Sequence, residues 1–123
     1  MAIDFELECS VDSARRARRE LEPLRSQLGE ELFDDIRLLT NELVTNSVLH
    51  SGSDAVEVRV EVRADKVRVQ VADRGLGRPA VGHTRLMDTS GRGLILVSSL
   101  ADRWGVAVDG KTLVWFEMNR PAL

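Results

Sequence analysis

Several features are scarce or missing in this sequence of 123 residues, and each absence excludes a class of protein. Cys9 is the only cysteine, so no disulfide can form within the chain, and this composition suits a reducing cytoplasm. No apolar run approaches the roughly 18 residues that a membrane-spanning helix needs, and the first residues lack the basic and apolar regions of a signal peptide. We therefore expect a cytoplasmic protein that makes no contact with a membrane.

An excess of basic residues is also missing, because the net charge at pH 7 is −3. A basic face is the usual mark of a nucleic-acid-binding domain, so we expect no direct binding to nucleic acid. A local cluster of arginines near the N-terminus is the exception, at Arg15, Arg16, Arg18 and Arg19. Such a run is usually a solvated helix face, although it could also dock a partner.

The composition that remains is typical of a globular domain, with 43% hydrophobic and 30% charged residues. The length is close to the common size of one domain and is sufficient for a hydrophobic core. No internal repeat, low-complexity segment or linker interrupts the chain. We therefore expect a single domain over residues 1–123.

Hydrophobic periodicity predicts the first two elements. Apolar residues alternate with polar ones over residues 3–9, which indicates a strand with one buried face. Apolar residues then recur every three or four positions, which predicts a helix that Ser10 or Asp12 can cap and that ends at Gly29. Val11 is the first of the apolar positions in this helical pattern, so we expect it to be buried.

The same patterns predict the rest of the chain. A long helix is expected over about residues 30–50, followed by an antiparallel valine hairpin over residues 56–71. Periodicity disappears between residues 73 and 93, where glycines dominate, and a helix over residues 94–100 follows. Two final strands flank Asp109-Gly110, which is a typical hairpin turn.

This order of elements predicts a fold of the α+β class. Strands and helices in this sequence form a two-layer α/β sandwich, with a mixed but mostly antiparallel sheet and the helices on one face. The polar face of the valine hairpin carries charges of both signs, so we expect it to contact water.

Glu42 and Asn46 lie four residues apart on the long predicted helix, so both side chains project from the same face. A carboxylate beside an amide oxygen suits a hard cation or an attacking hydroxyl. A polar pair at this spacing is also typical of a solvated helix face, so the pair does not by itself indicate a site.

Two glycine segments flank the predicted loop. Asp73 ends a valine strand and is followed by Gly75 and Gly77, where a carboxylate can accept a hydrogen bond from an exocyclic amine such as that of adenine. Gly91 and Gly93 open a helix, whose free N–H groups favour a phosphate. Each segment also has an ordinary explanation as a turn or a helix start, and neither matches GxxxxGK[ST] or a Rossmann GxGxxG.

The order of these motifs resembles the N, G1 and G2 boxes of the GHKL ATPases, which include gyrase, MutL and the histidine kinases. Further segments resemble the anti-sigma factor serine/threonine kinase branch of that superfamily, over roughly positions 10 to 118: ELVTNSVLHSG, DRGLGRP, GRGLILVSSLADRWGV and KTLVWFEM. The resemblance implies the Bergerat ATP-binding fold, with ATP and Mg²⁺ as ligands.

The resemblance also implies a role for each matching residue. Glu42 would be the general base that orients the attacking hydroxyl, Asn46 the Mg²⁺ ligand and Asp73 the partner of adenine. The base pocket would be shaped by Gly75 and Gly77.

The remaining matches concern the phosphates and the adenine ring. The phosphates would meet the residues that open the last helix, Gly91, Arg92, Gly93 and Leu94. Thr112 would help to hold adenine through water, and the segment between Gly77 and Gly91 would form the ATP lid.

The implied function is that of a protein serine/threonine kinase. It would phosphorylate a STAS-domain antagonist and, when free of it, hold a sigma factor inactive, and a homodimer is compatible with this family. One alternative is an ATP-dependent switch that binds a partner without phosphorylating it. A second is a detached histidine-kinase catalytic domain, which the missing dimerisation helix pair with its phospho-acceptor histidine disfavours.

Overall fold

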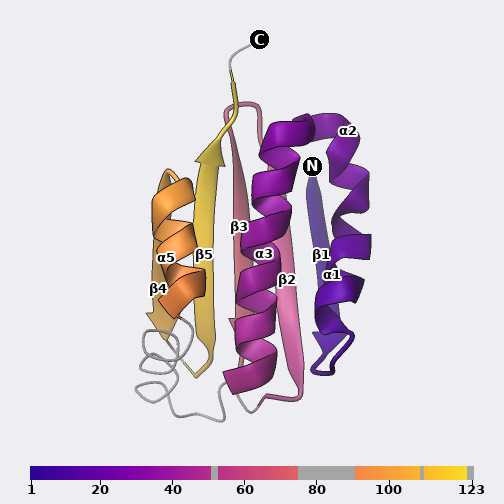
Figure 1. The fold of residues 1–123 in the computed structure, drawn as a ribbon, viewed down its shortest axis with the longest axis vertical. Helices are drawn as coiled ribbons and strands as arrows, with labels where there is room; N and C mark the ends of the chain where they lie inside the picture. The colour runs from indigo at the N-terminus through magenta and orange to yellow at the C-terminus, as the bar shows by residue number, and fades with distance from the viewer. Residues whose placement is uncertain (51–52, 75–90, 109, 122–123) are drawn as a thin grey trace.

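The strands and helices form two layers (Figure 1). The computed structural model describes residues 1–50, 53–74, 91–108 and 110–121, with the backbone alone at 50 and 91–94. The strands form one five-stranded sheet in the order β1-β2-β3-β5-β4. Their bounds are Ala2–Glu8 for β1, Ala55–Val62 for β2, Lys66–Asp73 for β3, Arg103–Val108 for β4 and Thr112–Asn119 for β5.

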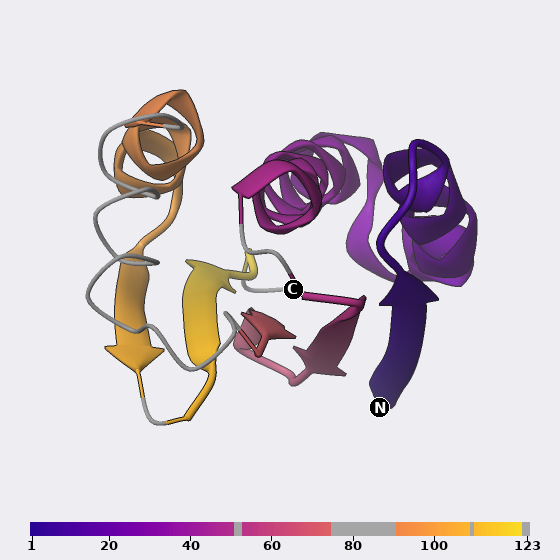
Figure 2. The ribbon, with the colours of Figure 1, turned by 90° about the horizontal axis from the view of Figure 1, so that it is seen from below.

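The helices lie together on one face of this sheet, as Figure 2 shows from below. Their bounds are Ser13–Leu21 for α1, Glu22–Leu24 for the 3₁₀ turn η1, Arg25–Leu28 for α2, Glu30–His50 for α3 and Gly91–Leu100 for α5. The predicted two-layer α+β architecture is confirmed. Every pairing between the described strands is antiparallel, so the sheet is more regular than the mixed sheet that the sequence predicted.

The core lies between the two layers because valines alternate along β2 and β3. Every second residue of these strands is buried, and α3 packs on both strands. The largest fully buried side chains include Phe33 of α3 and Phe116 of β5. Each such side chain contributes about 1.5–3 kcal/mol on burial, so the core accounts for most of the favourable folding energy. None of the described helices is both long and apolar enough to cross a bilayer.

The segment between residues 10 and 29 differs from the single helix that the sequence predicted. Pro23 lies in the 3₁₀ turn η1 between α1 and α2. Proline lacks the N–H that a continuous helix needs and its ring crowds the preceding turn, so the helix is interrupted there. Val11 was expected to be buried, and this prediction was wrong: it precedes α1 and is 99% exposed. Gly29 ends the segment with φ of 81°, as predicted for a helix stop.

The opposite face of the sheet is polar. Its ion pairs include Arg59 with Asp4 at 2.8 Å and Lys111 with Glu57 at 3.7 Å. Arg68 lies over the Trp115 ring, 4.3 Å from its centroid, on the same face. We call this side the open face and the other the helix-facing side.

Candidate functional site

Several of the predicted site residues come from four elements that meet at one end of the molecule. In Figure 1 the end of α3, the end of β3, the start of β5 and the start of α5 all lie at the lower end. Helix α3 contacts both β3 and α5, so these elements are packed together as well as aligned. The fold therefore brings together segments that are up to about seventy residues apart in the sequence.

Asp73 and Thr112 are neighbours across the β3–β5 ladder of this end. Both alternate with buried valines, so their side chains lie on the helix-facing side of the sheet. Their exposed fractions are only 7% and 4%. A carboxylate and a hydroxyl are therefore held side by side beneath the helix layer, where few polar groups are found.

Asn46 on α3 is buried against this end of the sheet, with an exposed fraction of 4%. Its side-chain nitrogen Nδ2 makes no hydrogen bond within the described ranges. A buried donor left in this state costs about 1–3 kcal/mol, so a ligand that accepts from it would be favoured. A solvated helix face is therefore the wrong interpretation for Asn46.

Glu42 lies one helical turn before Asn46 and is half-buried. The two side chains share one face of α3, as their spacing predicted. Seven described polar or charged residues are buried, and four of these lie where α3, β3 and β5 meet: Asn46, Ser47, Asp73 and Thr112. This concentration identifies the lower end of the helix-facing side as the candidate site.

The start of α5 supplies backbone N–H groups at the same end. Gly91, Arg92, Gly93 and Leu94 form the first turn of this ten-residue helix. The first four N–H groups of a helix have no partner within it, and they favour an anion. Gly75, Gly77 and the predicted lid lie outside the described residues, so their predicted roles stay predictions.

The thiol of Cys9 lies close enough to this site for the charge of Asp73 to act on it. Burial raises the pKa of the Cys9 thiol, and the negative charges of Asp73 and Asp54 raise it further. The thiol is therefore protonated at neutral pH, which disfavours it as a nucleophile. The arginine cluster lies elsewhere: its four residues are exposed on α1, and Arg15 pairs with Asp12 at 3.0 Å.

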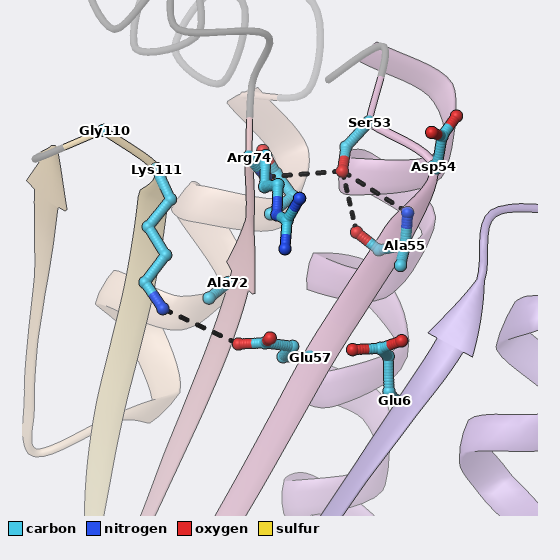
Figure 3. A pocket seen from close by; sticks show the side chains of 10 residues that line it. Glu6, Ser53, Asp54, Ala55, Glu57, Ala72, Arg74, Gly110 and Lys111 are labelled. Atoms are coloured by element: carbon cyan, nitrogen blue, oxygen red, sulfur yellow. Dashed lines mark hydrogen bonds and ion pairs between the residues drawn. The ribbon is translucent and has the colours of Figure 1, made fainter.

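A hollow at the same end of the sheet adjoins the candidate site, because Asp73 lines it together with residues of the open face. It has a volume of about 610 Å³, and Figure 3 shows Glu6, Glu57 and Lys111 lining it. These side chains are exposed and can be satisfied by water. We place the candidate site on the helix-facing side because Asn46 Nδ2 is buried there without a hydrogen bond to the described residues, whereas exposed side chains can be satisfied by water.

Ser53 also contacts the site, although the sequence patterns assigned it no role. Its hydroxyl accepts a hydrogen bond from the N–H of Arg74 at 3.3 Å, and so contacts the residue after Asp73. A serine that precedes a strand by two residues commonly bonds to nearby backbone, and this signal was present in the sequence.

Comparison with known proteins agrees with this geometry. Residues 6–118 match the family described as the histidine kinase-like ATPase domain. The chain belongs to this family. It is a family of ATP-binding domains, so the family and the fold that the motifs predicted are confirmed.

Curated relatives from two Listeria species carry the name serine-protein kinase RsbW. The protein from Listeria monocytogenes is 30% identical, and the match covers 81% of this chain and 75% of the relative. The protein from Listeria innocua is 29% identical with the same coverage.

A solved structure shows the same fold. It contains the RsbU and RsbW domains of a Mycobacterium tuberculosis protein and has a TM-score of 0.73 and 21% identity. The match covers 99% of this chain but only 34% of the larger one. This chain therefore corresponds to about a third of that protein.

Proposed function

We propose that this protein is an ATP-dependent serine/threonine kinase that phosphorylates a STAS-domain antagonist and sequesters a sigma factor when the antagonist is absent. The observation that carries this proposal is the cluster of buried polar residues at the end of an otherwise apolar interlayer: Asn46, Asp73 and Thr112. We further propose that residues 1–123 act as one domain, in the cytoplasm and without nucleic acid.

Adenine recognition is assigned to Asp73 and Thr112. A buried carboxylate can accept a hydrogen bond from the exocyclic amine of adenine, and the neighbouring hydroxyl can hold a bridging water. Gly75 and Gly77 follow Asp73 in the sequence, and we propose that their missing side chains let the base approach the backbone.

Mg²⁺ is assigned to the Asn46 side chain. No group of three or more His, Cys, Asp or Glu side chains in the described part of the chain is arranged so that it could hold a metal ion. Mg²⁺ commonly takes one or two protein ligands together with phosphates and water, so a single amide oxygen suits it. Binding through that oxygen also leaves the buried Nδ2 free to donate to a phosphate oxygen. When bound, Mg²⁺ neutralises and orients the phosphates.

We assign to Glu42 the role of general base in the transfer of the γ-phosphate. Its carboxylate is half-buried one turn before Asn46, where it can accept the proton of an attacking serine hydroxyl. The phosphates are assigned to the first turn of α5, at Gly91, Arg92, Gly93 and Leu94, where backbone N–H groups favour negative charge. The names of the Listeria relatives support serine as the acceptor.

Replacing the base tests the proposal. We expect Glu42→Gln to lower transfer of radiolabelled γ-phosphate to a purified STAS-domain antagonist by about 10²–10⁴-fold, the usual contribution of a general base. The dissociation constant for ATP should stay the same, because glutamine keeps the size and the polarity of the side chain. The matched control is Glu57→Gln on the open face, which should change neither quantity.

Two results would count against the kinase. Unchanged transfer by Glu42→Gln would remove the base from the mechanism. An ATP-dependent complex with the antagonist but no labelled product, even for the wild type, would favour the alternative of a binding switch.

A further inference from the structure

One serine hydroxyl joins the segment after α3 to the residue that follows Asp73. Ser53 Oγ accepts hydrogen bonds from the N–H of Arg74 at 3.3 Å and of Ala55 at 3.4 Å. It donates to the carbonyl oxygen of Ala55 at 2.8 Å, and Figure 3 shows these three contacts. The hydroxyl thus donates one of these hydrogen bonds and accepts the other two.

This contact lies at the end of the β2–β3 ladder. The β2–β3 ladder ends where Val56 pairs with Asp73, and the next pair in register would be Ala55 with Arg74. Ala55 pairs on its other side with Glu8 of β1. The N–H of Arg74 is therefore the first that lies beyond the ladder, and the Ser53 hydroxyl takes the place of the missing strand partner.

The contact also links the two chain segments that carry the proposed ATP-binding residues Asn46 and Asp73. Asn46 belongs to α3, which ends at residue 50, and Ser53 follows three residues after that end. Arg74 directly follows Asp73 at the end of β3. The Ser53 hydroxyl therefore joins the segment just before β2 to the backbone next to Asp73.

We infer that Ser53 is a positioning residue for nucleotide binding, because it holds the backbone at Asp73 and Arg74 in register with the start of β2. This inference rests on the proposed function, and Ser53 itself contacts no reacting group. Holding an acceptor in place before the ligand arrives lowers the entropic cost of binding.

Stabilisation of the fold alone is a weaker explanation for the hydrogen bonds of Ser53. Ser53 is half-buried and Arg74 is exposed, so water can replace the hydrogen bonds that a missing hydroxyl would leave unmade. Losing the hydroxyl should therefore change the free energy of unfolding little. What is lost is the fixed position of the backbone next to Asp73.

The test uses Ser53→Ala with Mg-ATP as the probe. We expect calorimetry to give a dissociation constant about two- to tenfold higher than the wild type, in line with one lost hydrogen bond. Phosphate transfer at saturating ATP should be unchanged, so the effect should appear in KM and not in kcat. Hydrogen exchange at the Arg74 amide should become faster, and Ser53→Thr should restore both the affinity and the slow exchange.

Ser98→Ala is the matched control, because Ser98 is an exposed serine with one local hydrogen bond, to the carbonyl of Ile95 at 2.9 Å. It should leave ATP affinity unchanged. Equal affinity of Ser53→Ala and wild type would overturn the inference and leave the proposed function standing. A wild type that binds no ATP would overturn the proposed function, and the inference with it.

Discussion

The two faces of the sheet both carry carboxylates, but in opposite surroundings. Asp73, on the helix-facing side, is 7% exposed next to buried Thr112. Glu57, on the open face, is exposed and lies 3.7 Å from Lys111. Burying a charged group costs several kcal/mol unless a partner offsets it, whereas a solvated ion pair contributes about 0–1 kcal/mol. Depth within the fold therefore separates Asp73 from Glu57, although Glu117 on the open face is equally buried and is paired with Arg68 at 3.0 Å.

Shape alone would not locate the site. The hollow of about 610 Å³ is lined by Asp73 but also by Glu6 and Glu57, which are directly opposite each other in the β1–β2 register of the open face. Glu6 and Glu57 are exposed to water, so they do not require a ligand. The buried amide of Asn46 on the other side is the stronger indication.

Removing the charge of the buried Asp73 should have the largest effect, compared with removing the charge of a nearby exposed carboxylate. We expect Asp73→Asn to weaken ATP binding about 10–100-fold, because a hydrogen bond to a charged group contributes about 1.5–3 kcal/mol. The matched control is Asp54→Asn, an exposed carboxylate at the edge of the hollow, which should leave the affinity within twofold. Calorimetric titration of both variants measures this. Equal losses in the two variants would contradict the assignment of adenine to the helix-facing side.

A packing change on the open face should affect stability and not binding. A Cβ atom added at Gly105 would lie 2.8 Å from Nε1 of Trp115, so Gly105→Ala should displace the indole. We expect a loss of about 1–3 kcal/mol in the free energy of unfolding, the usual cost of overpacking. Chemical denaturation measures the loss, with Ala107→Ser on the same strand as a control that should change stability by less than about 0.5 kcal/mol. A large loss of ATP affinity in Gly105→Ala would contradict the expectation that packing on the open face does not affect ATP binding.

The smallest expected effect concerns Glu117 and depends on pH. Burial raises the pKa of this carboxyl, but the hydrogen bond from Arg68 and the charges of Lys66, Arg68 and Arg103 outweigh it and lower the pKa. A lowered pKa in the folded state gives stability that is present above the unfolded pKa of about 4.3 and is lost as the pH falls through the folded pKa.

Glu117→Gln tests this behaviour. It should cost about 1 kcal/mol at neutral pH, a modest value because Arg68 and Lys66 are partly exposed. The difference from the wild type should shrink as the pH falls below about 4, in urea denaturation curves measured at several pH values. A difference that stays constant down to pH 2 would contradict the ion-pair explanation.

Strong periodicity made most of the fold predictable from the sequence. Alternating valines fixed both strands of the first hairpin, and α3 occupies residues 30–50 as predicted. The segment around Pro23 was less predictable, because an apolar spacing of three or four continues through a proline that the backbone cannot follow. Val11 fitted the pattern only by its spacing, since the helix begins after it.

The burial of the candidate site residues could not be predicted from the sequence. The spacing of Glu42 and Asn46 fixed a shared helix face, but only the packing of α3 on β3 buries Asn46. The contact of Ser53 with Arg74 spans 21 residues and depends on where the β2–β3 ladder ends, which no local pattern fixes. Long-range register is the information that the sequence pattern lacks.

The central claim is that ATP binds on the helix-facing side, at the lower end of the interlayer. An amide NMR titration of the wild type with ATP and Mg²⁺ tests it most directly, because it reports both the affinity and the place of binding. We predict a dissociation constant in the micromolar range, about −8 kcal/mol, with the largest shifts at the amides of Asn46, Asp73 and Thr112. Shifts confined to the hollow around Glu6, Glu57 and Lys111, or none at all, would contradict the claim.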